Sequence, residues 1–412
     1  MIDSDSTITD ARQENAILLL LAAVQFTHIL DFMIMMPLGP QFMRVLHIDA
    51  QAFSWLISSY SYSAGVTGLL APLFIDRMGR KHLFCIMYAG FILGTLSCGF
   101  ANSYESLLMA RIFTGGFGGI LGALIFSIVG DLIPFQRRGR AMGIVMAGFS
   151  ASAVVGVPLG LFLATHWNYR VPFFVLAGLA SIVYVGIVWL VPAFKGHIEI
   201  NKPKAHFLRV YYEILKIPEV QVALVLMFIL VLGQFSVIPF ISAYYVSNVG
   251  FSERQLSFIY LFGGLMTAFT SPWAGRLADK FGKKRVFRCM AVASIIPLVL
   301  VTHLPPVHIG VALLVTTLFF AFVAGRMVPA MALITECVPA RIRGGFMSIH
   351  TAIQNTAAAV ASTIAGLLVT TGADRQLHGY PRVGYLAVLA TLFSLYLIGR
   401  LDLKIKARHE PE

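Results

Sequence analysis

The sequence predicts an all-α membrane protein whose twelve transmembrane helices form two pseudo-symmetric six-helix bundles. The first supporting observation is composition. Of the 412 residues, 58% are hydrophobic and only 12% are charged, about half the charged fraction of a soluble domain. The second is a series of twelve long apolar segments, and the third is a set of motifs that occurs once in each half of the chain.

Each apolar segment has the length that a helix needs to cross a bilayer, about 20 residues. In chain order, the expected spans are 16–38, 53–75, 83–101, 107–130, 139–164, 171–192, 219–246, 255–278, 286–303, 309–334, 344–370 and 383–401. Segments of this length exclude transmembrane strands, which alternate over about ten residues. A long polar linker, 193–218, divides the spans six and six, so 1–192 and 219–412 are the expected bundles.

Charged residues predict the orientation of these spans. If the N-terminus lies inside, the inner tails and loops hold 24 of the 31 Lys and Arg residues, the outer loops hold five, and Arg111 and Arg326 fall within spans. This bias places both termini on the cytoplasmic side of the cell (inner) membrane. The acidic N-terminal segment lacks the positive region of a signal peptide, so the first span is expected to be retained. The net charge of +12 is then a topology signal, and no nucleic-acid partner is expected.

Three motifs of the first half recur in the second half in the same order. The pairs are DRMGRKHLF (76–84) with DKFGKKRVF (279–287), GDLIPFQRRGRAM (130–142) with TECVPARIRGGFM (335–347), and QFTHI (25–29) with QFSVI (234–238). Offsets near half the chain length indicate two halves of common ancestry. Parallel repeats of this kind are the architecture of a large class of transporters, with the substrate site between the halves.

Three segments of the first half carry recognisable motifs. GLLAPLFIDRMGRKHLF at 68–84 resembles the loop 2–3 signature of the major facilitator superfamily, and LLMARIFTGGFGG at 107–119 resembles its helix 4 signature, with Arg111 at the arginine position. GFSASAVVGVPLGLFLA at 148–164 is similar to the helix 5 signature of the drug/proton antiporter branch. It departs from that pattern at Ser152, where glycine is common, and at GVPLG, which replaces a glycine–proline doublet. The resemblance covers essentially the whole chain and is nearest to bacterial sugar exporters and multidrug efflux carriers.

The resemblance implies a transporter that works by alternating access, with helices 1, 4, 7 and 10 lining a central cavity. It also implies a cytoplasmic gate, a charge cluster in which an aspartate faces the N-terminus of the eleventh span while the inner side is closed. The gate residues are Asp76, Arg80 and Asp131, and their counterparts in the second half are Asp279, Lys283 and Glu336. The alternative is that these charges only fix the topology.

Asp31 stands in the apolar segment VQFTHILDFMIMMPLGP, where a carboxylate is costly unless it is paired or used. At 1.5 Å per residue it lies roughly 22 Å along the first span, at a depth comparable to that of Arg111. Gln25, His28 and Met35 share its helical face, which is therefore polar over three turns.

The second half has no counterpart of Asp31, because the alignment of QFTHI with QFSVI puts Phe240 opposite it. An architectural residue is expected in both halves, whereas a proton site needs to exist only once. Two interpretations stay open. Asp31 forms a static salt bridge with Arg111, or it is a protonation site linked to transport, in which His28 either relays protons or only hydrogen-bonds Asp31.

Further polar side chains inside the expected spans are candidates for a substrate cavity. They are Gln25, Gln234, Arg326, His350, Gln354 and Asn355. Arg326 lies roughly 15 Å from the inner end of the tenth span, close to mid-membrane. There it either caps carbonyl groups or pairs with a distant acid, or it binds an anionic or polyhydroxyl substrate.

The fifth span contains Gly148, Gly156, Pro158 and Gly160. Small residues let membrane helices approach closely and a proline bends a helix, so these residues predict a tightly packed, bent span. A role in blocking leak or fixing the direction of transport is the additional hypothesis.

The favoured functional hypothesis is a secondary active transporter, a proton-coupled exporter of small organic molecules such as drug-like compounds or sugars. The alternatives are a proton-coupled importer (symporter) of a small metabolite, anionic or not, and a non-transporting membrane receptor. The sequence contains no P-loop, nucleophile elbow or HExxH motif, so neither an enzyme nor an ATP-driven pump is expected. The four cysteines lack metal-ligand spacing, and no cofactor or metal is expected. The expected partners are a small-molecule substrate, protons and the lipid bilayer, with the protein as a monomer.

Overall fold

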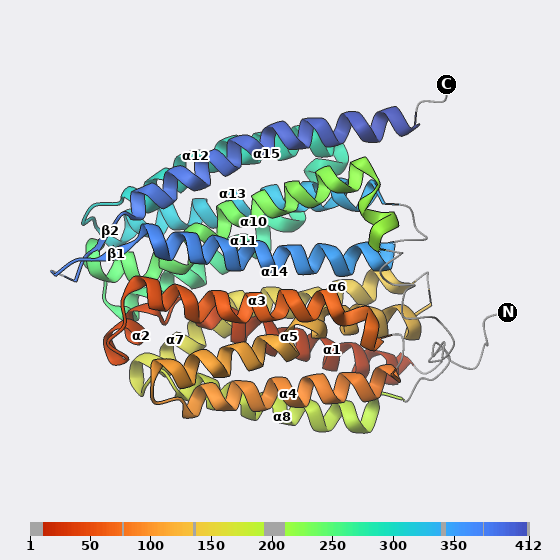
Figure 1. Ribbon diagram of the computed structural model, residues 1–412, viewed down its shortest axis with the longest axis horizontal. Helices are drawn as coiled ribbons and strands as arrows, with labels where there is room; N and C mark the ends of the chain where they lie inside the picture. The colour runs from red at the N-terminus through yellow and green to blue at the C-terminus, as the bar shows by residue number, and fades with distance from the viewer. Residues whose placement is uncertain are drawn as a thin grey trace.

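The structure, a computed structural model, describes residues 11–75, 78–134, 137–192, 211–338, 343–373 and 375–409. Within these ranges the chain is almost entirely helical, and its long helices run side by side along one direction (Figure 1). The helices of the first half are α1 (Ala11–Ile34), α2 (Gly39–Val45), α3 (Ala50–Ile75), α4 (Arg80–Phe100), α5 (Tyr104–Leu132), α6 (Arg138–Ala151), the π-helix η3 (Ser152–Gly156), α7 (Val157–His166) and α8 (Val171–Leu190). Those of the second half are α10 (Pro218–Tyr244), the π-helix η4 (Tyr245–Val249), α11 (Glu253–Phe281), α12 (Lys283–His303), α13 (Ile309–Glu336), α14 (Arg343–Leu368) and α15 (Tyr380–His409). A hairpin of β1 (Thr370–Thr371) and β2 (Leu377–His378) joins α14 to α15.

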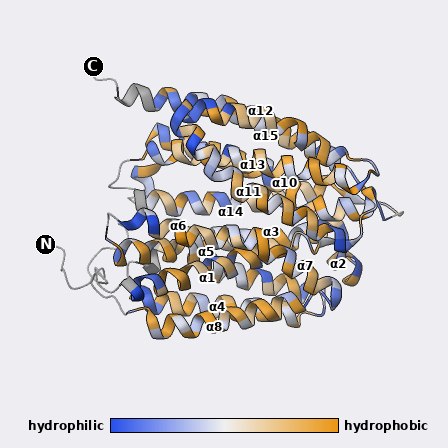
Figure 2. Cartoon of the chain, turned by 180° about the vertical axis from the view of Figure 1, so that it is seen from behind, coloured by the Kyte–Doolittle hydropathy of each residue, from blue (hydrophilic) through white to orange (hydrophobic). Residues whose placement is uncertain are grey.

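Nine helical segments of the described chain are long and apolar enough to cross a membrane. They are α1, α4, α5, α6 to α7, α8, α10 with η4, α12, α13 and α15. The remaining long helices, α3, α11 and α14, have 26, 29 and 26 residues and lie among the nine (Figure 1). Figure 2 shows apolar residues along the helices, with polar residues gathered at both ends of the bundle. The chain is therefore an all-α, multi-pass membrane protein, and its long helices fit twelve spans.

The helices coincide with the predicted spans to within a few residues at most ends, and the clearest error is in the first span. The predicted span 16–38 is wrong at its end, because α1 ends at Ile34 and the separate short helix α2 follows. Pro37 and Pro40 explain the break, since neither has the N–H that would continue the hydrogen bonding of α1. The hairpin β1–β2 was not predicted either, and it begins within the last residues of the predicted span 344–370.

The fifth span is continuous but contains a π-helical turn. Pro158 lies at the start of α7, where its ring nitrogen cannot donate to the preceding turn, and η3 occupies that turn. The Ser152 hydroxyl shares its one proton between two carbonyl oxygens, that of Gly148 at 2.9 Å and that of Phe26 on α1 at 2.8 Å. The polar Ser152 is thus satisfied within the bundle, and it attaches the π-helix to α1.

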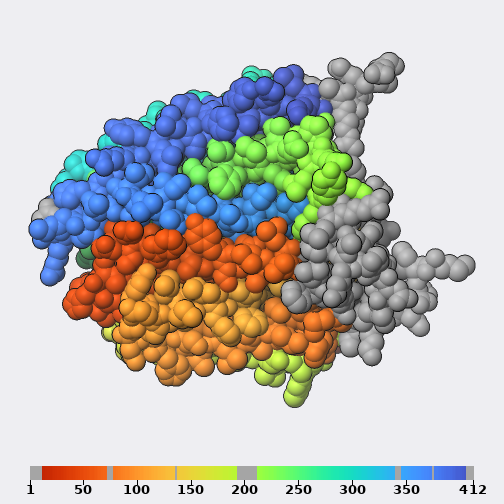
Figure 3. Space-filling view, in the orientation of Figure 1, coloured from red at the N-terminus to blue at the C-terminus, as the bar shows by residue number. Residues whose placement is uncertain are grey.

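The helices α1 to α8 occupy one side of the molecule and α10 to α15 the other (Figure 1). The two most extensive packing contacts between the sides are α3 against α14 and α11 against η3 and α7. Figure 3 shows the first of these on the visible face, where α3 lies directly against α14. Most of the polar linker that was predicted at 193–218 lies outside the described residues.

Of the three large clusters of buried apolar residues in the described chain, one is shared by both sides and two are confined to one side. The shared cluster lies at the end of the bundle that carries α2 and the hairpin, and it includes Phe42 and Phe53 from one side and Phe240 and Tyr245 from the other. The rings of Phe53 and Phe240 meet edge to face with centroids 5.9 Å apart. At the opposite end, one large cluster contains only first-half residues and another only second-half residues. The bundle is therefore closed by shared apolar packing at its α2 end.

Polar contacts reinforce the same closure. Glu253, at the start of α11, forms an ion pair with Arg44 of α2 and accepts a hydrogen bond from Gln41 Nε2 at 2.8 Å. The backbone N–H of Ala50 donates to the hydroxyl of Thr371 at 3.3 Å. These three contacts join the two sides across the α2 end. We call Arg44, Gln41 and Glu253 the outer clasp.

Candidate functional site

The carboxylate of Asp31 is fully buried between three helices of the first half. One oxygen, Oδ2, accepts a hydrogen bond from Arg111 Nη1 of α5 at 2.7 Å, and the other, Oδ1, accepts from the Thr95 hydroxyl of α4 at 3.0 Å. The side chains of Asp31 and Arg111 are both 0% exposed. A buried charge is tolerated when it is paired and hydrogen-bonded, and both oxygens of Asp31 meet this requirement.

Arg111 is less completely satisfied than its partner. Only Nη1 reaches the carboxylate, whereas Nε and Nη2 are buried and have no hydrogen-bond partner among the described residues. The guanidinium carbon lies 4.4 Å from the centroid of the Tyr60 ring of α3, which gives the cation an aromatic face. The pair therefore lacks the two parallel bonds of the strongest arginine–carboxylate geometry. Such an arrangement leaves Arg111 held partly by Asp31 and partly by Tyr60.

The glycines of the fourth-span motif explain why Tyr60 can lie so close to Arg111. A Cβ atom added at Gly115 would overlap the carbonyl oxygen of Tyr60, and one at Gly119 would overlap that of Ala64. Only glycine permits this approach of α5 to α3, as is common where membrane helices pack closely. The motif LLMARIFTGGFGG thus supplies both the cation and the space for its aromatic neighbour.

His28 and Tyr60 approach each other at Gly118 of α5. A Cβ atom added at Gly118 would overlap the Tyr60 hydroxyl oxygen and lie 3.3 Å from Cδ2 of His28. The Nδ1 atom of His28 and the Tyr60 hydroxyl are buried without a hydrogen-bond partner among the described residues. Three titratable or polar groups, those of His28, Asp31 and Tyr60, therefore lie along α5 between Arg111 and Gly118, about two helical turns.

The residue after Asp31 reaches the second half of the chain. Phe32 lies beside Tyr60, with ring centroids 5.5 Å apart, and beside Phe235 of α10, with centroids 5.7 Å apart. Contacts between side chains thus run from the Asp31–Arg111 pair through Tyr60 and Phe32 to Phe235. We call Tyr60, Phe32 and Phe235 the aromatic bridge.

The second half has no equivalent pair. Phe240, opposite Asp31 in the repeat, is fully buried in the shared apolar cluster. The offset of 205 between the recurring motifs at 130–142 and 335–347 places Thr316 opposite Arg111, and its hydroxyl lies 3.5 Å from that of Tyr245. Within the described residues, a fully buried ion pair therefore occurs in the first half only.

The candidate cavity residues fall into two groups. Gln234, Gln354 and Asn355 are half-buried, whereas Gln25 and His350 are buried, and Gln25 Oε1 and His350 Nε2 have no hydrogen-bond partner among the described residues. These side chains lie on α1, α10 and α14.

Arg326 lies apart from these residues, between α13, α12 and α15. Its Nη1 atom donates to the hydroxyls of Thr391 at 2.8 Å and Ser294 at 3.3 Å. No described carboxylate forms an ion pair with Arg326, and its Nε is unpartnered among the described residues. Its observed neighbours are thus hydroxyl groups of the second half.

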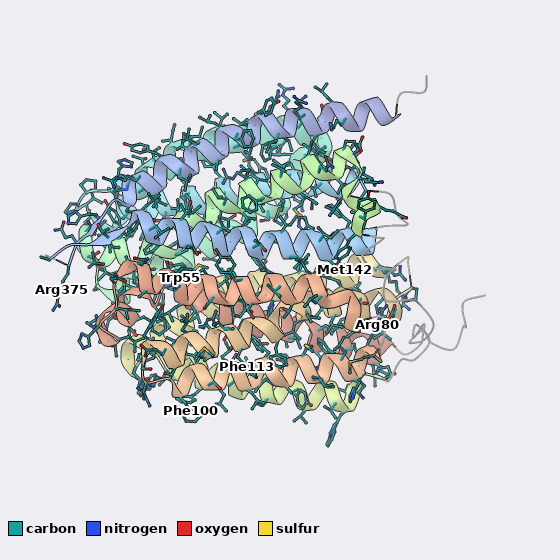
Figure 4. The ribbon with its side chains drawn as sticks, viewed as in Figure 1. Trp55, Arg80, Phe100, Phe113, Met142 and Arg375 are labelled. Carbon is teal, nitrogen blue, oxygen red and sulfur yellow. The ribbon has the colours of Figure 1, made fainter. Side chains whose placement is uncertain are left out.

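The predicted gate residues are partly brought together. Arg80 and Asp131 form an ion pair at the end of the bundle opposite α2, and Figure 4 shows Arg80 at one end and Arg375 at the other. In the second half, Lys283 Nζ lies 2.7 Å from Glu336 Oε2. Asp279 is exposed, and within the described chain it has no ion pair, while Asp76 lies outside the described residues.

The glycines of the fifth span contact α1. A Cβ atom added at Gly148 would overlap the Ala22 carbonyl oxygen, and one at Gly156 would lie 2.9 Å from the Leu30 side chain. Gly160 packs in the same way against Ile34, one turn beyond Asp31. These contacts hold the helix that carries Asp31 against the fifth span.

Several residues of the site were not predicted from the sequence. Thr95 and Tyr60 are uncharged and belong to different spans, so spacing along the chain does not connect them with Asp31. The run SSYSYS at 58–63, unusually rich in hydroxyls for a span, was the available signal for Tyr60. The outer clasp was also not predicted, because Arg44 entered the sequence analysis only as a loop charge and Glu253 did not enter it.

Together, the fold and this buried pair define a multi-pass membrane protein with an ionisable site inside a helical bundle. A sequence profile of the Major Facilitator Superfamily matches residues 21–220 and 223–410. The chain therefore belongs to the Major Facilitator Superfamily, whose members are transporters.

Individual relatives resemble the chain over most of its length. It is 25% identical to the uncharacterized MFS-type transporter YceJ of Bacillus subtilis (strain 168), over 84% of this chain and 87% of the relative. It is 22% identical to multidrug resistance protein 2 of the same organism, over 70% of this chain and 73% of the relative. The solved structure of a D-xylose-proton symporter matches with a TM-score of 0.75 at 17% identity, over 93% of this chain and 97% of the symporter. This structural likeness shows the fold.

Proposed function

We propose that the protein is a proton-coupled secondary transporter that exports small organic molecules, drug-like compounds or sugars, by alternating access. The observation that carries this proposal is the buried Asp31–Arg111 pair, which occurs in one half of a repeated fold. Ionisable groups inside membrane proteins commonly mark ion pathways and proton relays. Similarity to a protein named multidrug resistance protein 2 supports export as the direction.

Protonation of Asp31 is the proposed coupling step. The charged carboxylate holds Arg111 Nη1 at 2.7 Å, and a neutral carboxyl group attracts the guanidinium far less. Arg111 then depends on Tyr60, whose ring already lies 4.4 Å from the guanidinium carbon. A proton can shift a conformational equilibrium only if its affinity differs between the two states, and loss of this ion pair supplies such a difference.

The aromatic bridge is the proposed connection between the proton site and the opposite bundle. Phe32 follows Asp31 directly and contacts Phe235 of α10, so movement at the pair changes packing across the interface. We place the substrate near this interface, among Gln25, Gln234, His350, Gln354 and Asn355, with Arg326 as an accessory cation of the same bundle.

The two bundles, 1–192 and 219–412 with the linker 193–218, are proposed to rock against each other. The outer clasp and the shared apolar cluster close the α2 end in the observed state. Separation at that end would be matched by closure at the other, where we propose that the gate residues Asp76, Arg80, Asp131, Asp279, Lys283 and Glu336 contribute. Gly148, Gly156, Pro158 and Gly160 are proposed to keep the fifth span sealed during this motion.

The charge bias of the loops supports a cell (inner) membrane location with both termini in the cytoplasm. The α2 end is then the outer end, and the observed state is closed toward the outside. We propose that a single chain is the transporting unit, because each bundle contributes half of the interface at which substrate binds.

The test is proton movement caused by substrate in proteoliposomes that contain the purified protein and a pH-sensitive dye. A panel of drugs, sugars, amino acids and lipids is first screened by thermal shift, and compounds that bind are added in the presence of a pH gradient. Export by exchange predicts protons moving opposite to the compound. Movement in the same direction would establish the proton-coupled importer instead, and binding compounds that move without protons would refute coupling.

A further inference from the structure

A groove of about 280 Å³ lies between α12 and α15 on the surface of the second half, near the start of α12 and toward the end of α15. Its lining includes Lys284, Arg288, Tyr396, Gly399 and Arg400. Figure 2 shows polar residues on α12 and α15 toward the C-terminal end of α15 and mostly apolar residues along the rest of both helices. The groove is remote from Asp31, and nothing in the proposed transport mechanism uses it.

The groove carries uncompensated positive charge. Lys284 Nζ is paired with Asp402 Oδ2 at 2.9 Å, but neither Arg288 nor Arg400 forms an ion pair with a carboxylate of the described chain. Arg400 Nε donates to the Tyr396 hydroxyl at 2.8 Å, which leaves its two terminal nitrogens available. Two guanidinium groups that line one groove repel each other unless an anion lies between them.

Gly399 allows the two arginines to share the groove. The Nη2 atom of Arg288 would lie 3.1 Å from a Cβ atom at position 399, so the side chain extends from α12 across the backbone of α15. Arg400 is the next residue of α15. A planar guanidinium binds phosphate oxygens through two parallel N–H groups, so this pair is suited to a phosphate group.

The surface beyond the arginines is suited to hydrocarbon chains. On α12, the residues four, eight and twelve positions after Arg288 are Val292, Ile296 and Leu300, which are 54%, 68% and 44% exposed. At 3.6 residues per turn, Val292 and Ile296 lie on the side of the helix that carries Arg288, and Leu300 lies about 120° around the helix from it. On α15, Leu389 and Leu392 are 63% and 47% exposed. Two apolar rows thus run from the groove into the region that hydrocarbon occupies.

The groove lies at the membrane depth where lipid headgroups are found. Arg288 lies five residues after the first residue of α12, roughly 8 Å along the helix, and Arg400 lies near the end of the apolar segment Tyr380–Lys404. Positively charged residues at this level of a membrane protein meet lipid phosphates.

We propose that this groove binds an anionic phospholipid, with its phosphate between Arg288 and Arg400, its headgroup near Tyr396 and its acyl chains along α12 and α15. The positive charge of the groove favours a lipid with a net negative charge over a zwitterionic one. The proposal depends on the membrane location of these helices and is independent of the direction or coupling of transport.

The test is native mass spectrometry of the purified full chain titrated with dioleoyl phosphatidylglycerol or with dioleoyl phosphatidylcholine. The wild type is expected to retain one phosphatidylglycerol at concentrations that give little bound phosphatidylcholine. The double variant Arg288→Gln/Arg400→Gln should weaken this first binding step by about tenfold or more, since tenfold equals 1.4 kcal/mol and matches the strength of a charge-assisted hydrogen bond.

The matched control is Arg276→Gln/Arg285→Gln, which removes the same charge from exposed arginines at the same end of α11 and α12. It should bind phosphatidylglycerol as the wild type does. Equal loss in both double variants would show a general charge effect and overturn the site. Unchanged binding in the Arg288→Gln/Arg400→Gln variant would overturn it directly.

Two further results would identify another occupant. If inorganic phosphate displaces the lipid at the concentration of the lipid itself, the groove is a phosphate site without chain recognition. If the wild type forms a lipid-free dimer that the groove variant lacks, the groove is an interface between two copies. Should the double variant fail to fold, Arg400→Lys keeps the charge but removes the guanidinium, and it is expected to bind phosphatidylglycerol more weakly than the wild type.

Discussion

Phe32 of α1 and Phe235 of α10 touch across the two halves of the transporter, with ring centroids 5.7 Å apart. Phe32 also contacts Tyr60, whose ring lies under the guanidinium of Arg111. Among the ion pairs of the described first half, Asp31–Arg111 is the one in which both side chains are 0% exposed, and Phe32, the residue next to Asp31, contacts the opposite bundle. This contact offers a physical reason why the state of Asp31 should affect the arrangement of the halves.

If the aromatic bridge links protonation of Asp31 to movement of the opposite bundle, Phe32 and Phe235 act together. Phe32→Ala and Phe235→Ala should each slow proton-driven transport by roughly two- to tenfold, the equivalent of one aromatic contact of about 0.5–1.5 kcal/mol. The double variant should be no slower than the slower single variant. Transport rates of all four proteins in proteoliposomes test this cycle. Phe269→Ala, at a 70% exposed site on α11, is the control and should transport normally. Multiplicative effects of the two changes would show that the rings act independently.

Close packing of α3 on α5 is required for the site. Gly115→Ala should lower the free energy of unfolding by about 1–3 kcal/mol, because the new methyl group overlaps the Tyr60 carbonyl oxygen and the helices must separate. Gly122→Ala is the matched control on the same helix, since nothing lies within 4 Å of its Cβ position. Thermal unfolding of the purified variants is the measurement. Equal stability of the two variants would contradict the packing account.

The outer clasp should stabilise the state that is closed at the α2 end. Arg44→Gln removes one partner of Glu253, and because the Arg44 side chain is 58% exposed, the effect should be modest, about 0.2–1 kcal/mol. In the Arg44→Gln variant, the distance between spin labels placed on the two bundles at the α2 end should be long in a larger fraction of molecules than in the wild type. The neighbouring Arg254→Gln, at an exposed site without an ion pair in the described chain, should leave the distances unchanged. The same shift in both variants would assign the effect to net charge.

Most of the fold could be predicted from the sequence because a membrane helix is a local feature. A run of about 20 apolar residues has few alternatives in lipid, so the spans were located to within a few residues at most ends. The end of α1 was missed because apolar residues continue through Met35 and Met36, and hydropathy does not register the prolines at 37 and 40. The π-helix η3 depends on hydrogen bonds and not on composition, so no apolar pattern could indicate it.

The candidate site could be predicted only where a charge marked it. Asp31 and Arg111 stand out because they are ionisable groups among apolar residues, and their depths along two antiparallel spans can be compared by counting residues. Thr95 and Tyr60 complete the site by the way α3, α4 and α5 pack, which residue spacing within one helix does not reveal. For Arg326, the sequence predicted the depth in the membrane but not the neighbours of the side chain. It points toward Ser294 and Thr391 of the second half.

The topology can be tested with single cysteines in a background in which the four native cysteines are replaced. Pro306→Cys lies in the exposed segment between α12 and α13, and Lys280→Cys lies at the exposed end of α11. With both termini inside, an impermeant thiol reagent should label position 306 in intact cells and position 280 only after lysis. Labelling of position 280 in intact cells would reverse the orientation and with it the assignment of the outer clasp.

The buried pair leads to a prediction about stability as well as coupling. Asp31→Asn leaves Arg111 as an unpaired buried cation, which should lower the free energy of unfolding by about 3–5 kcal/mol. The double variant Asp31→Asn/Arg111→Gln has no buried charge at this position and should recover much of that loss. Thermal unfolding of the two variants checks this difference, and equal stability would mean that Arg111 finds another partner.

The most direct test of the central claim is accumulation of substrate driven by a proton gradient in proteoliposomes that contain folded Asp31→Asn or the neutral double variant. Glu105→Gln, at an exposed carboxylate of the same bundle, is the control and should accumulate substrate as the wild type does. The account predicts that both Asp31 variants lose accumulation against a gradient but still exchange labelled for unlabelled substrate. Accumulation at the wild-type rate by Asp31→Asn would contradict the account and leave Asp31 and Arg111 as a structural ion pair.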